Sequence, residues 1–344
     1  MSATIKDIAR ATGLSLSTIS KYINGGSVRQ SNRIAIEQAI KEFDFHPNEA
    51  AQAIRCKTRR TIVVIIPNIN VDYCRSLVLY CQNRLREENY AVVFYDCNND
   101  AAFEEKLIRK AISNRADGII AIPMNVENPG YAYAREEGVP VVFLCPRAET
   151  EADYVVSDDI NASTELIRRL GENGHKRVGV IVGRTEYRAM MGLLEVERKI
   201  LEEYVGEITD DLIYPDPRLS LDVGYNGAKT LLSLEDPPTA LICLNGELLL
   251  GAKIAILEMG LRIPEDVSLC GFALESLSAS PVLEQITHVR YPMNRMSEEA
   301  VRVVLERINE KREAEDSGKK WIPGSSVTEV DAEACFRSSI KLLG

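Results

Sequence analysis

The sequence contains little that could build a metal site or a disulfide framework. Its eight cysteines include no Cys-x-x-Cys pair, and its three histidines lie far apart along the chain. Several cysteines stand inside apolar runs such as VVFLC and LICL, where a thiol acts as a small hydrophobic side chain. We therefore expect no metal, no cofactor and no disulfides, but reduced core cysteines in a cytoplasmic protein.

Long apolar segments and common catalytic motifs are also missing. No hydrophobic run approaches the roughly 20 residues that a membrane-spanning helix needs. The first ten residues carry three charges and no apolar stretch, so we expect no secretory signal peptide. The sequence has no G-x-S-x-G elbow, no P-loop and no G-x-G-x-x-G after a strand. These absences argue against an enzyme.

Charge is unevenly distributed along the 344 residues, whose formal net charge is -10. Residues 1–60 carry ten basic and five acidic side chains, a net charge of +5. The other 284 residues therefore carry -15. A small basic head on an acidic body indicates a polyanionic partner for the head alone. A free solute-binding protein would need a signal peptide and no such head, so this class is disfavoured.

Residues 1–46 are predicted to form three short helices around a small core. Thr4 is placed to cap the first helix, with Asp7 answering it as in a capping box, and Ser15 and Ser31 are placed to cap the second and third. The side chains expected to face inward are Ile5, Ile8, Ala9, Ile19, Tyr22, Ile23, Ile36, Ala39, Ile40 and Phe43.

The first two of these helices, joined by a tight turn that contains glycine, have the helix-turn-helix form, whose second helix enters the major groove of DNA. Ser17, Ser20 and Lys21 share the outward side of that helix, and Leu16 could contact a thymine methyl group. The expected base contacts are Leu16, Ser17, Ser20 and Lys21. The expected phosphate contacts are Thr4, Ser15, Thr18, Asn24, Ser31 and His46.

Residues 47–60 are interpreted as a hinge and linker. Pro47 breaks the chain, and the following segment EAAQAIR has good helix propensity but is too short to be a stable helix alone. We expect this segment to become helical only when it docks on DNA.

Residues 61–344 alternate apolar β-branched runs with amphipathic segments, the pattern of buried parallel strands with crossover helices. The expected strands include the runs 61–67, 90–96, 117–123, 139–145, 177–183, 210–215, 239–244 and 267–272. The expected helices include 72–88, 102–114 and a late one at about 293–313, followed by two terminal strands. We assign a first lobe to about 61–157 and 289–320, and a second lobe to about 158–288 and 321–344.

The whole chain resembles the lactose-repressor (LacI/GalR-type) family of bacterial transcriptional regulators. The resemblance is strongest in the head, in TIKDIARATGLSLSTISKYING and the following HPNEAAQAIR. Weaker signatures in the body are DGIIAIP, GVPVVF, VVSDD, NGHKRVGVI, PPTALICLN and GLRIPEDVSLCGF. Coverage runs from Thr4 to about Arg337.

The resemblance implies an all-α helix-turn-helix head and an α/β body made of two Rossmann-like lobes of the periplasmic-binding-protein type with parallel sheets. It places Leu16, Ser17 and Lys21 where the family reads bases. It also implies a homodimer on a roughly palindromic double-stranded operator. The residues that fall on the family's minor-groove hinge helix are Asn48, Ala51, Ile54 and Arg55. Ile54 replaces the leucine that the family usually inserts between base pairs.

The family binds its effector in the cleft between the lobes, and there this sequence departs from the pattern. The usual G-F-D-D motif reads Gly-Phe-Ala-Leu at 271–274, Cys145 stands at a position that often carries aspartate, and Leu219 stands at a stacking aromatic. Several hydroxyl acceptors that a neutral sugar would need are thus missing. The candidate effector residues are Asn68, Tyr73, Asn98, Arg147, Arg188, Asn245, Glu247 and Arg290.

Arginines near the expected cleft favour an acidic effector over a neutral one. Arg147, Arg188, Arg218 and Arg290 lie at or near expected strand ends that the resemblance places toward the cleft. Because a guanidinium binds carboxylate or phosphate through its planar fork, an acidic or phosphorylated sugar-like ligand is favoured over a neutral sugar. The sequence predicts a DNA-binding regulator, a repressor modulated by such a ligand. Its alternatives are an activator, or a regulator without small-molecule response.

Overall fold

The computed structural model describes residues 3–23, 26–45, 59–145, 148, 150–183, 198–216, 218–274 and 281–343. The chain divides into two compact units, Met1–Arg59 and Arg60–Gly344, called here the head and the body. The predicted site residues that lie outside the described ranges are Asn24, His46, Asn48, Ala51, Ile54, Arg55, Arg147 and Arg188.

The head contains the three predicted helices. Their bounds are α1 Ile5–Thr12, α2 Leu16–Ile23 and α3 Gln30–Glu42. Ile8, Ile19 and Ile36, one from each helix, are fully buried and form the centre of the core, as predicted. Burial of three such side chains stabilises a domain of this size by several kcal/mol, at about 1.5–3 kcal/mol each.

Two predictions for α3 are wrong. Ser31 does not cap the helix, because the helix begins at Gln30 and Arg29 occupies the capping position. Phe43 is 41% exposed, and Phe45 takes its expected place in the core. The reason is that α3 ends at Glu42: Asp44 adopts a positive φ of 45°, and the amide of Phe45 donates to the carbonyl of Ile40 at 2.9 Å, which turns Phe45 inward.

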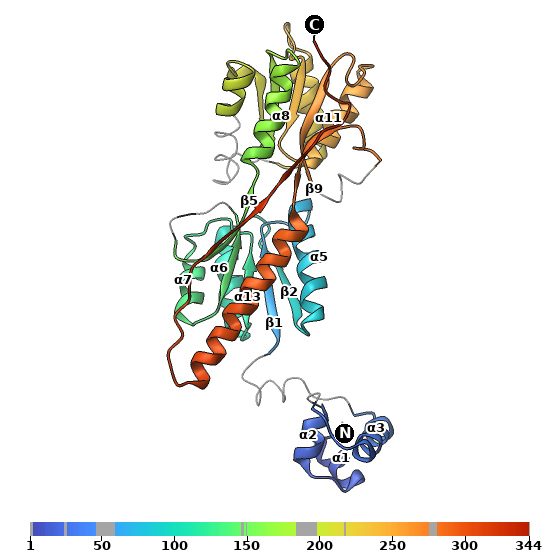
Figure 1. The fold of residues 1–344 in the computed structure, drawn as a ribbon, viewed down its shortest axis with the longest axis vertical. Helices are drawn as coiled ribbons and strands as arrows, with labels where there is room; N and C mark the ends of the chain where they lie inside the picture. The colour runs from blue at the N-terminus through green and yellow to red at the C-terminus, as the bar shows by residue number, and fades with distance from the viewer. Residues whose placement is uncertain are drawn as a thin grey trace. The chain divides into compact units, whose positions relative to one another are not determined.

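The body consists of two α/β lobes, each built on a six-stranded sheet (Figure 1). The first sheet has the strand order β11-β5-β4-β3-β1-β2 and the second has β12-β10-β9-β8-β6-β7. The strands of the first sheet are β1 Thr61–Ile66, β2 Ala91–Asp96, β3 Gly118–Ala121, β4 Val141–Leu144, β5 Asp153–Asp158 and β11 Val327–Asp331. Those of the second are β6 Val178–Gly183, β7 Ile213–Asp216, β8 Ala240–Cys243, β9 Ser268–Leu274, β10 Thr287–Tyr291 and β12 Glu333–Cys335.

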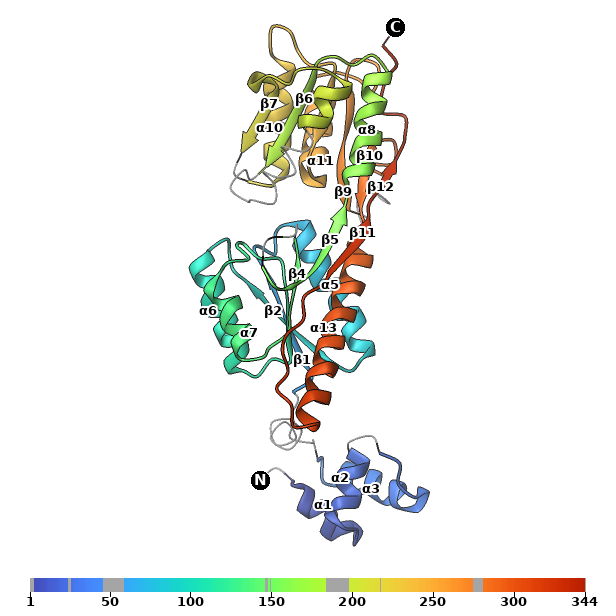
Figure 2. The ribbon, with the colours of Figure 1, turned by 60° about the vertical axis from the view of Figure 1, so that its left-hand side comes forward.

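Helices cover both faces of the first sheet: α6 and α7 lie on one side, α5 and α13 on the other (Figure 2). The helices of this lobe are α5 Asp72–Glu87, α6 Ala101–Ser113, α7 Pro129–Glu136 and α13 Met293–Asp316. The second lobe contains α8 Ile160–Glu172, α10 Leu221–Leu232 and α11 Gly246–Glu258, with a 3-10 turn at Asp210–Leu212.

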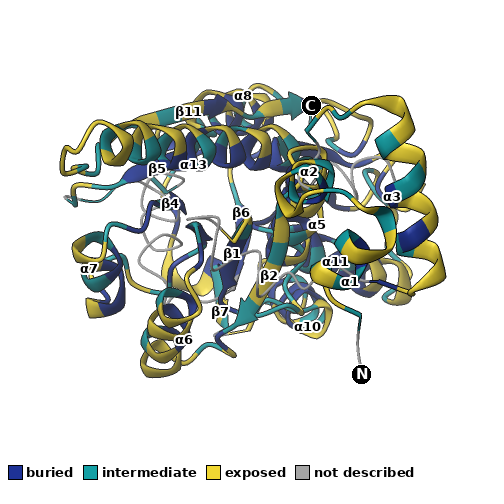
Figure 3. Cartoon of the chain, turned by 90° about the horizontal axis from the view of Figure 1, so that it is seen from below, coloured by how far each residue is buried: buried dark blue, intermediate teal, exposed yellow. Residues whose placement is uncertain are grey.

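Strand β1 shows why this lobe forms. Successive side chains of a strand point to opposite faces, and here both faces are apolar. Val64 faces the layer of α5 and α13, whereas Val63 faces the layer of α6 and α7. Buried positions accordingly line the inner sides of these helices, whose outer sides are exposed (Figure 3). Gly118 on β3 lets α13 approach, because a Cβ there would lie 2.6 Å from a methyl carbon of Val304.

The predicted lobe assignment is wrong in two segments. Residues 327–331 form β11, which pairs in parallel with β5 of the first sheet, although we expected 321–344 in the second lobe. Residues 289–291 belong to β10 of the second sheet, not to the first lobe. The predicted strands were otherwise found where expected, but β5 and β10 were not among them. The sequence of β10, THVRY, carries His288 and Arg290 on one face and is therefore not an apolar run like the predicted strands.

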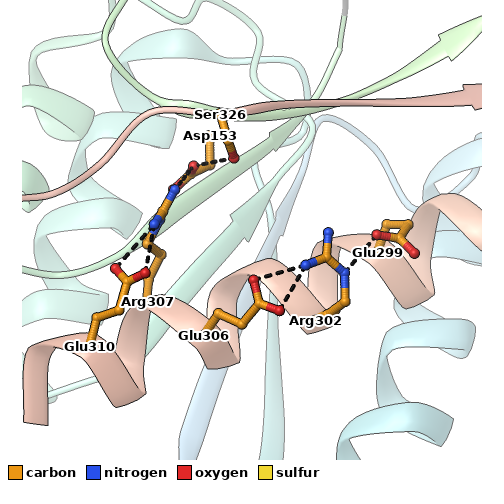
Figure 4. A network of polar contacts seen from close by, with 7 residues as sticks. All are labelled: Asp153, Glu299, Arg302, Glu306, Arg307, Glu310 and Ser326. Atoms are coloured by element: carbon orange, nitrogen blue, oxygen red, sulfur yellow. Dashed lines mark hydrogen bonds and ion pairs between the residues drawn. The ribbon is translucent and has the colours of Figure 1, made fainter. Parts of the chain in front are cut away.

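The carboxylate of Asp153, at the start of β5, joins helix α13 to the residue that precedes β11. The guanidinium of Arg307 donates to both carboxylate oxygens of Asp153, at 2.9 and 2.8 Å, and the hydroxyl of Ser326 donates to the same carboxylate at 2.7 Å (Figure 4). The Arg307 and Asp153 side chains are only 18% and 5% exposed. This bidentate pair holds the pKa of Arg307 above its usual range.

Candidate nucleic-acid interface and inter-lobe site

Both ends of α1 are fixed by local contacts, and a tight turn joins α1 to α2. The amide of Thr4 and its hydroxyl both donate to the carboxylate of Asp7, at 2.9 and 2.6 Å, which fixes the start of α1 and lowers the pKa of Asp7. At the other end Gly13 takes a left-handed φ of 67°, and its amide donates to the carbonyl of Ala9. Glycine adopts this conformation without steric cost, so the chain can reverse directly into α2.

Hydroxyl groups surround the start of α2. The hydroxyl of Ser15 accepts from the amide of Thr18 at 3.2 Å, as predicted for a helix cap, and lies 2.8 Å from the hydroxyls of Ser17 and Thr18. Leu16 is 46% exposed beside them. The N-terminal end of a helix carries unpaired amide donors and a positive partial charge, and both favour an anion such as phosphate.

The other end of α2 presents Lys21 to solvent. The amide of Gly26 donates to the carbonyl of Lys21 at 2.8 Å, and a Cβ at Gly26 would lie only 2.6 Å from Cγ of Lys21. The methylene stem of the lysine therefore lies on the glycine. This contact holds the lysine stem in place, and its ammonium group remains exposed on the same helix that carries Ser17.

A polar contact between helices orients α2. The hydroxyl of Tyr22 donates to Oε1 of Glu37 at 2.8 Å, and Nε of Arg33 donates to the same oxygen at 2.8 Å. The two donors hold the pKa of Glu37 below its usual range. Because Tyr22 is on α2 and the other two residues are on α3, this contact fixes the rotation of α2 about its axis, and sequence reasoning had assigned Tyr22 to the core only.

All four predicted base contacts thus lie on one helix. Leu16, Ser17 and Lys21 are exposed and Ser20 is half-buried. Among the predicted phosphate contacts, Thr4, Ser15 and Thr18 lie in the first turns of α1 and α2, and Ser31 lies in the first turn of α3. This is a polar, basic helix face held by a small rigid core.

The second candidate site lies where the two lobes meet. The ring of Tyr73, at the start of α5, contacts that of Tyr291, at the end of β10, edge to face with centroids 6.4 Å apart. The hydroxyl of Tyr291 donates to Asp159 at 3.0 Å. Across the same junction Arg75 of the first lobe lies 3.7 Å from Glu247 of the second. Tyr73, Arg75, Asp159, Glu247 and Tyr291 are called here the junction cluster.

Two carboxyl groups of the junction cluster are partly desolvated. Burial raises the pKa of Asp159, and the hydrogen bond from Tyr291 offsets part of that shift. Burial likewise raises the pKa of Glu247, against the opposing charge of Arg75. Desolvated carboxylates that keep hydrogen-bonding capacity are suited to accept bonds from ligand hydroxyls. Sequence reasoning missed Arg75, Asp159 and Tyr291, although VVSDD contains Asp159.

The other predicted effector residues have local roles. Oδ1 of Asn68 accepts from the amide of Asn70 at 2.9 Å, Asn98 is an exposed turn residue with φ 49°, and Oδ1 of Asn245 caps α11 by accepting from Leu248 at 2.8 Å. Arg290 pairs with Glu333 on the neighbouring strand β12.

The arginine hypothesis loses support in the described part of the chain. Arg218 bonds to Asp216 and Asp222, so both it and Arg290 already have carboxylate partners. Arg147 and Arg188 lie outside the described residues. Over the described ranges, no group of three or more histidine, cysteine or acidic side chains is arranged to hold a metal ion. No helix found there has the length and hydrophobicity to cross a bilayer.

Two family models match the sequence. Residues 4–48 match the model described as "Bacterial regulatory proteins, lacI family", and residues 167–327 match a periplasmic binding protein-like domain. A relative from Vibrio atlanticus, the HTH-type transcriptional repressor PurR, is 27% identical over 99% of both chains. The repressor of the same name from Escherichia coli O1:K1 is 27% identical over 92% of this chain and 93% of its own.

Solved structures share the fold. The lac repressor dimer bound to operator and the anti-inducer ONPF is 19% identical, with a TM-score of 0.81 over 99% of this chain and 100% of its own. The transcriptional regulator CelR in complex with cellobiose is 24% identical, with a TM-score of 0.66 over 98% and 99% of the two chains. The helix-turn-helix head and the two-lobed parallel-sheet body predicted from the sequence are thereby confirmed.

Proposed function

We propose that the chain is a member of the LacI family of bacterial regulatory proteins and a sequence-specific DNA-binding repressor, whose operator affinity is set by a small ligand at the lobe junction. The single observation that carries this proposal is the face of α2, on which the exposed Leu16, Ser17 and Lys21 stand on a rigid three-helix core. A helix presented in this way reads base edges in the major groove. A regulator of this kind acts in the cytoplasm, where the DNA is.

The charge distribution supports the same proposal. Residues 1–60 carry +5 and the other 284 residues -15, so contact with the phosphate backbone is favoured for the N-terminal segment only. Residues 48–55, within this segment, are proposed as the hinge that enters the minor groove, with Ile54 as the side chain that wedges a base step.

Replacement of Lys21 tests the proposed interface. The operator is first isolated by selecting bound DNA from a random pool. Lys21→Ala is expected to weaken binding to that operator by about 1–3 kcal/mol if the ammonium contacts a base edge. Binding is measured by fluorescence anisotropy on operator and on random DNA at one salt concentration.

The matched control is Lys41→Ala, which removes an exposed lysine of α3. It is expected to change operator affinity by less than Lys21→Ala. An equal loss on operator and random DNA would make Lys21 a phosphate contact and refute its role in sequence reading. If no sequence is enriched from the pool, the repressor proposal fails.

A homodimer is proposed from apolar side chains that the body exposes. The first lobe exposes Leu79 on α5 and Phe94 on β2, which is an edge strand, and the second exposes Ile254 and Leu257 on α11. Clusters of large apolar side chains on a surface indicate a protein interface. Two heads held by such an interface match the two halves of a symmetric operator.

For the effector, we infer a sugar-like ligand bound at the junction cluster. Two tyrosine rings offer apolar faces, and Asp159 and Glu247 offer acceptors to hydroxyl groups. Because Asp159 and Glu247 would repel a negatively charged ligand, these acceptors shift the expectation toward a neutral one. The CelR structure contains cellobiose, which supports this ligand class for the fold.

A thermal-shift screen of neutral sugars, sugar acids and sugar phosphates tests the inference. A neutral sugar at 100 times its dissociation constant is expected to stabilise the body by about 2.7 kcal/mol, and Asp159→Asn to reduce that stabilisation. Stabilisation by sugar acids or phosphates alone would contradict a neutral ligand. If no compound stabilises the protein, a regulator without small-molecule response is favoured.

A further inference from the structure

The first lobe contains a cavity of about 220 Å³ away from the junction cluster. It lies between α7, strands β4 and β5, and the segment that returns from α13 to β11. Its aromatic walls are Tyr131 of α7, Phe143 of β4 and Trp321 of the returning segment. Apolar cavities of roughly 150 Å³ bind benzene, so the volume suffices for one aromatic ring with a short substituent.

The wall formed by α7 is held in place from behind. Glu104 of α6 is fully buried and accepts from the hydroxyl of Tyr131 at 2.8 Å and from Nδ2 of Asn128 at 3.0 Å. The Tyr131 ring meets that of Phe143 edge to face, with centroids 4.7 Å apart. These contacts fix both rings before any ligand enters, so binding would require little reorganisation.

The opposite wall is also fixed. Arg307 lies over Gly324, where a Cβ would come within 2.9 Å of the guanidinium carbon, and its bond to Asp153 neutralises the buried carboxylate at the cavity's edge. The negative charge of Asp153 is thus compensated before a ligand binds. Trp321 and Pro323 close this side.

One cationic group lines the cavity with a weakly held partner. Arg135 of α7 bonds to the main-chain carbonyl of Glu151 and to its side chain, at 2.6 Å from Oε2. The Glu151 side chain is 82% exposed, and such surface ion pairs contribute at most about 1 kcal/mol. A ligand carboxylate can therefore replace that of Glu151 on the guanidinium at small cost, although Glu127 at the rim opposes a ligand with further negative charge.

We propose that this cavity binds a small aromatic carboxylate, with its ring among Tyr131, Phe143 and Trp321 and its carboxylate on Arg135. An arylacetate fits the volume of the cavity. Its carboxylate is separated from its ring as Arg135 at the rim is separated from the apolar walls. The site is independent of the proposed effector site. It adjoins Asp153 and Gly324, next to the strands β5 and β11 that leave the lobe.

Titration of the full chain with phenylacetate tests the proposal. Trp321 is the only tryptophan in the sequence, so its fluorescence reports on the cavity directly. Phenylacetate is expected to change the emission saturably, with a dissociation constant on the order of 0.1–1 mM for about ten non-hydrogen atoms. Phenylacetamide, which lacks the charge, is expected to bind about tenfold more weakly. Acetate is expected to leave the emission unchanged.

Two variants locate the binding. Arg135→Gln is expected to weaken phenylacetate about tenfold and phenylacetamide little, and Ala132→Leu, which narrows the mouth of the cavity, to weaken both. Their matched controls on α6 are Arg109→Gln, which removes an exposed arginine paired with Glu105, and Ala102→Leu. Circular dichroism checks that each variant is folded.

The proposal is overturned if phenylacetate gives no saturable change up to about 10 mM, ten times the weakest expected dissociation constant. It is also overturned if the two α7 variants titrate like their α6 controls, because the ligand then binds elsewhere. Neither result affects operator binding, so failure here is distinguishable from failure of the repressor proposal.

Discussion

Arg307→Leu is expected to lower the free energy of unfolding of the body by about 3–5 kcal/mol, the cost of leaving one partner of a buried ion pair without the other. Asp153 would keep its bond from Ser326 but lose both bonds from the guanidinium. The loss is expected in urea-induced unfolding followed by circular dichroism, as a lower midpoint with an unchanged slope.

The matched control is Arg302→Leu on the same helix. Arg302 also has two carboxylate partners, Glu299 and Glu306, but its side chain is 48% exposed (Figure 4). An exposed pair contributes at most about 1 kcal/mol, so this variant is expected to unfold near the original midpoint. If both variants lowered the free energy of unfolding equally, burial would not explain the contribution of the Arg307–Asp153 pair to stability. Adding Asp153→Asn to Arg307→Leu should recover part of the loss, because the unpaired charge is then removed.

The double variant Leu79→Glu, Phe94→Glu is expected to convert the protein to a monomer and to weaken operator binding by about 100-fold or more. Val64 of β1 and Phe94 of β2 are register partners, so both face the α5 side of the sheet, where Leu79 is also exposed. In a two-fold symmetric dimer, the two introduced carboxylates would lie opposite the same carboxylates of the second chain and repel them. Loss of the dimer removes the second head, and linked binding of two sites typically contributes 10²–10⁴ in affinity.

Analytical ultracentrifugation measures the mass, and anisotropy measures operator binding. The control variant Leu342→Glu changes a leucine that is 70% exposed, more than Leu79 at 55%, and that lies outside this surface; it is expected to leave both unchanged. A double variant that stays dimeric would place the interface elsewhere. A monomer that binds the operator with undiminished affinity would refute the need for two heads.

Much of the fold could be predicted because local patterns determine it. The run 61–66 is apolar on both alternating sets, which only a strand covered on two faces accommodates. The end of the chain could not be assigned in the same way. Strands β11 and β12 are short and mostly exposed, and a single residue separates them, yet they join different sheets. Strand β11 pairs with β5 and strand β12 pairs with β10, and the sequence does not indicate either pairing.

The two candidate sites differ for a similar reason. The face of α2 could be predicted because its residues are neighbours along one helix, so spacing alone brings them together. The junction cluster could not, because Tyr291 and Asp159 are 132 residues apart and meet only when both sheets exist. Departures from the family pattern directed the sequence analysis to the region between the lobes, but not to these residues. The arginines chosen there have carboxylate partners wherever the structure describes them.

The pairing of β11 with β5 also sets the order in which the chain can fold during synthesis. The head and the first five strands of the first sheet emerge from the ribosome early, but β11 at 327–331 emerges only after almost the whole second lobe. Until then β5 is an open edge strand, whose backbone groups can pair with another chain. At a translation rate of about 5–20 residues per second, the roughly 170 residues between the strands leave that edge open for about 10–30 seconds. The nascent chain therefore depends on its last segment, rather than on the lobe that is synthesised first, to cover the edge of β5 and prevent aggregation there.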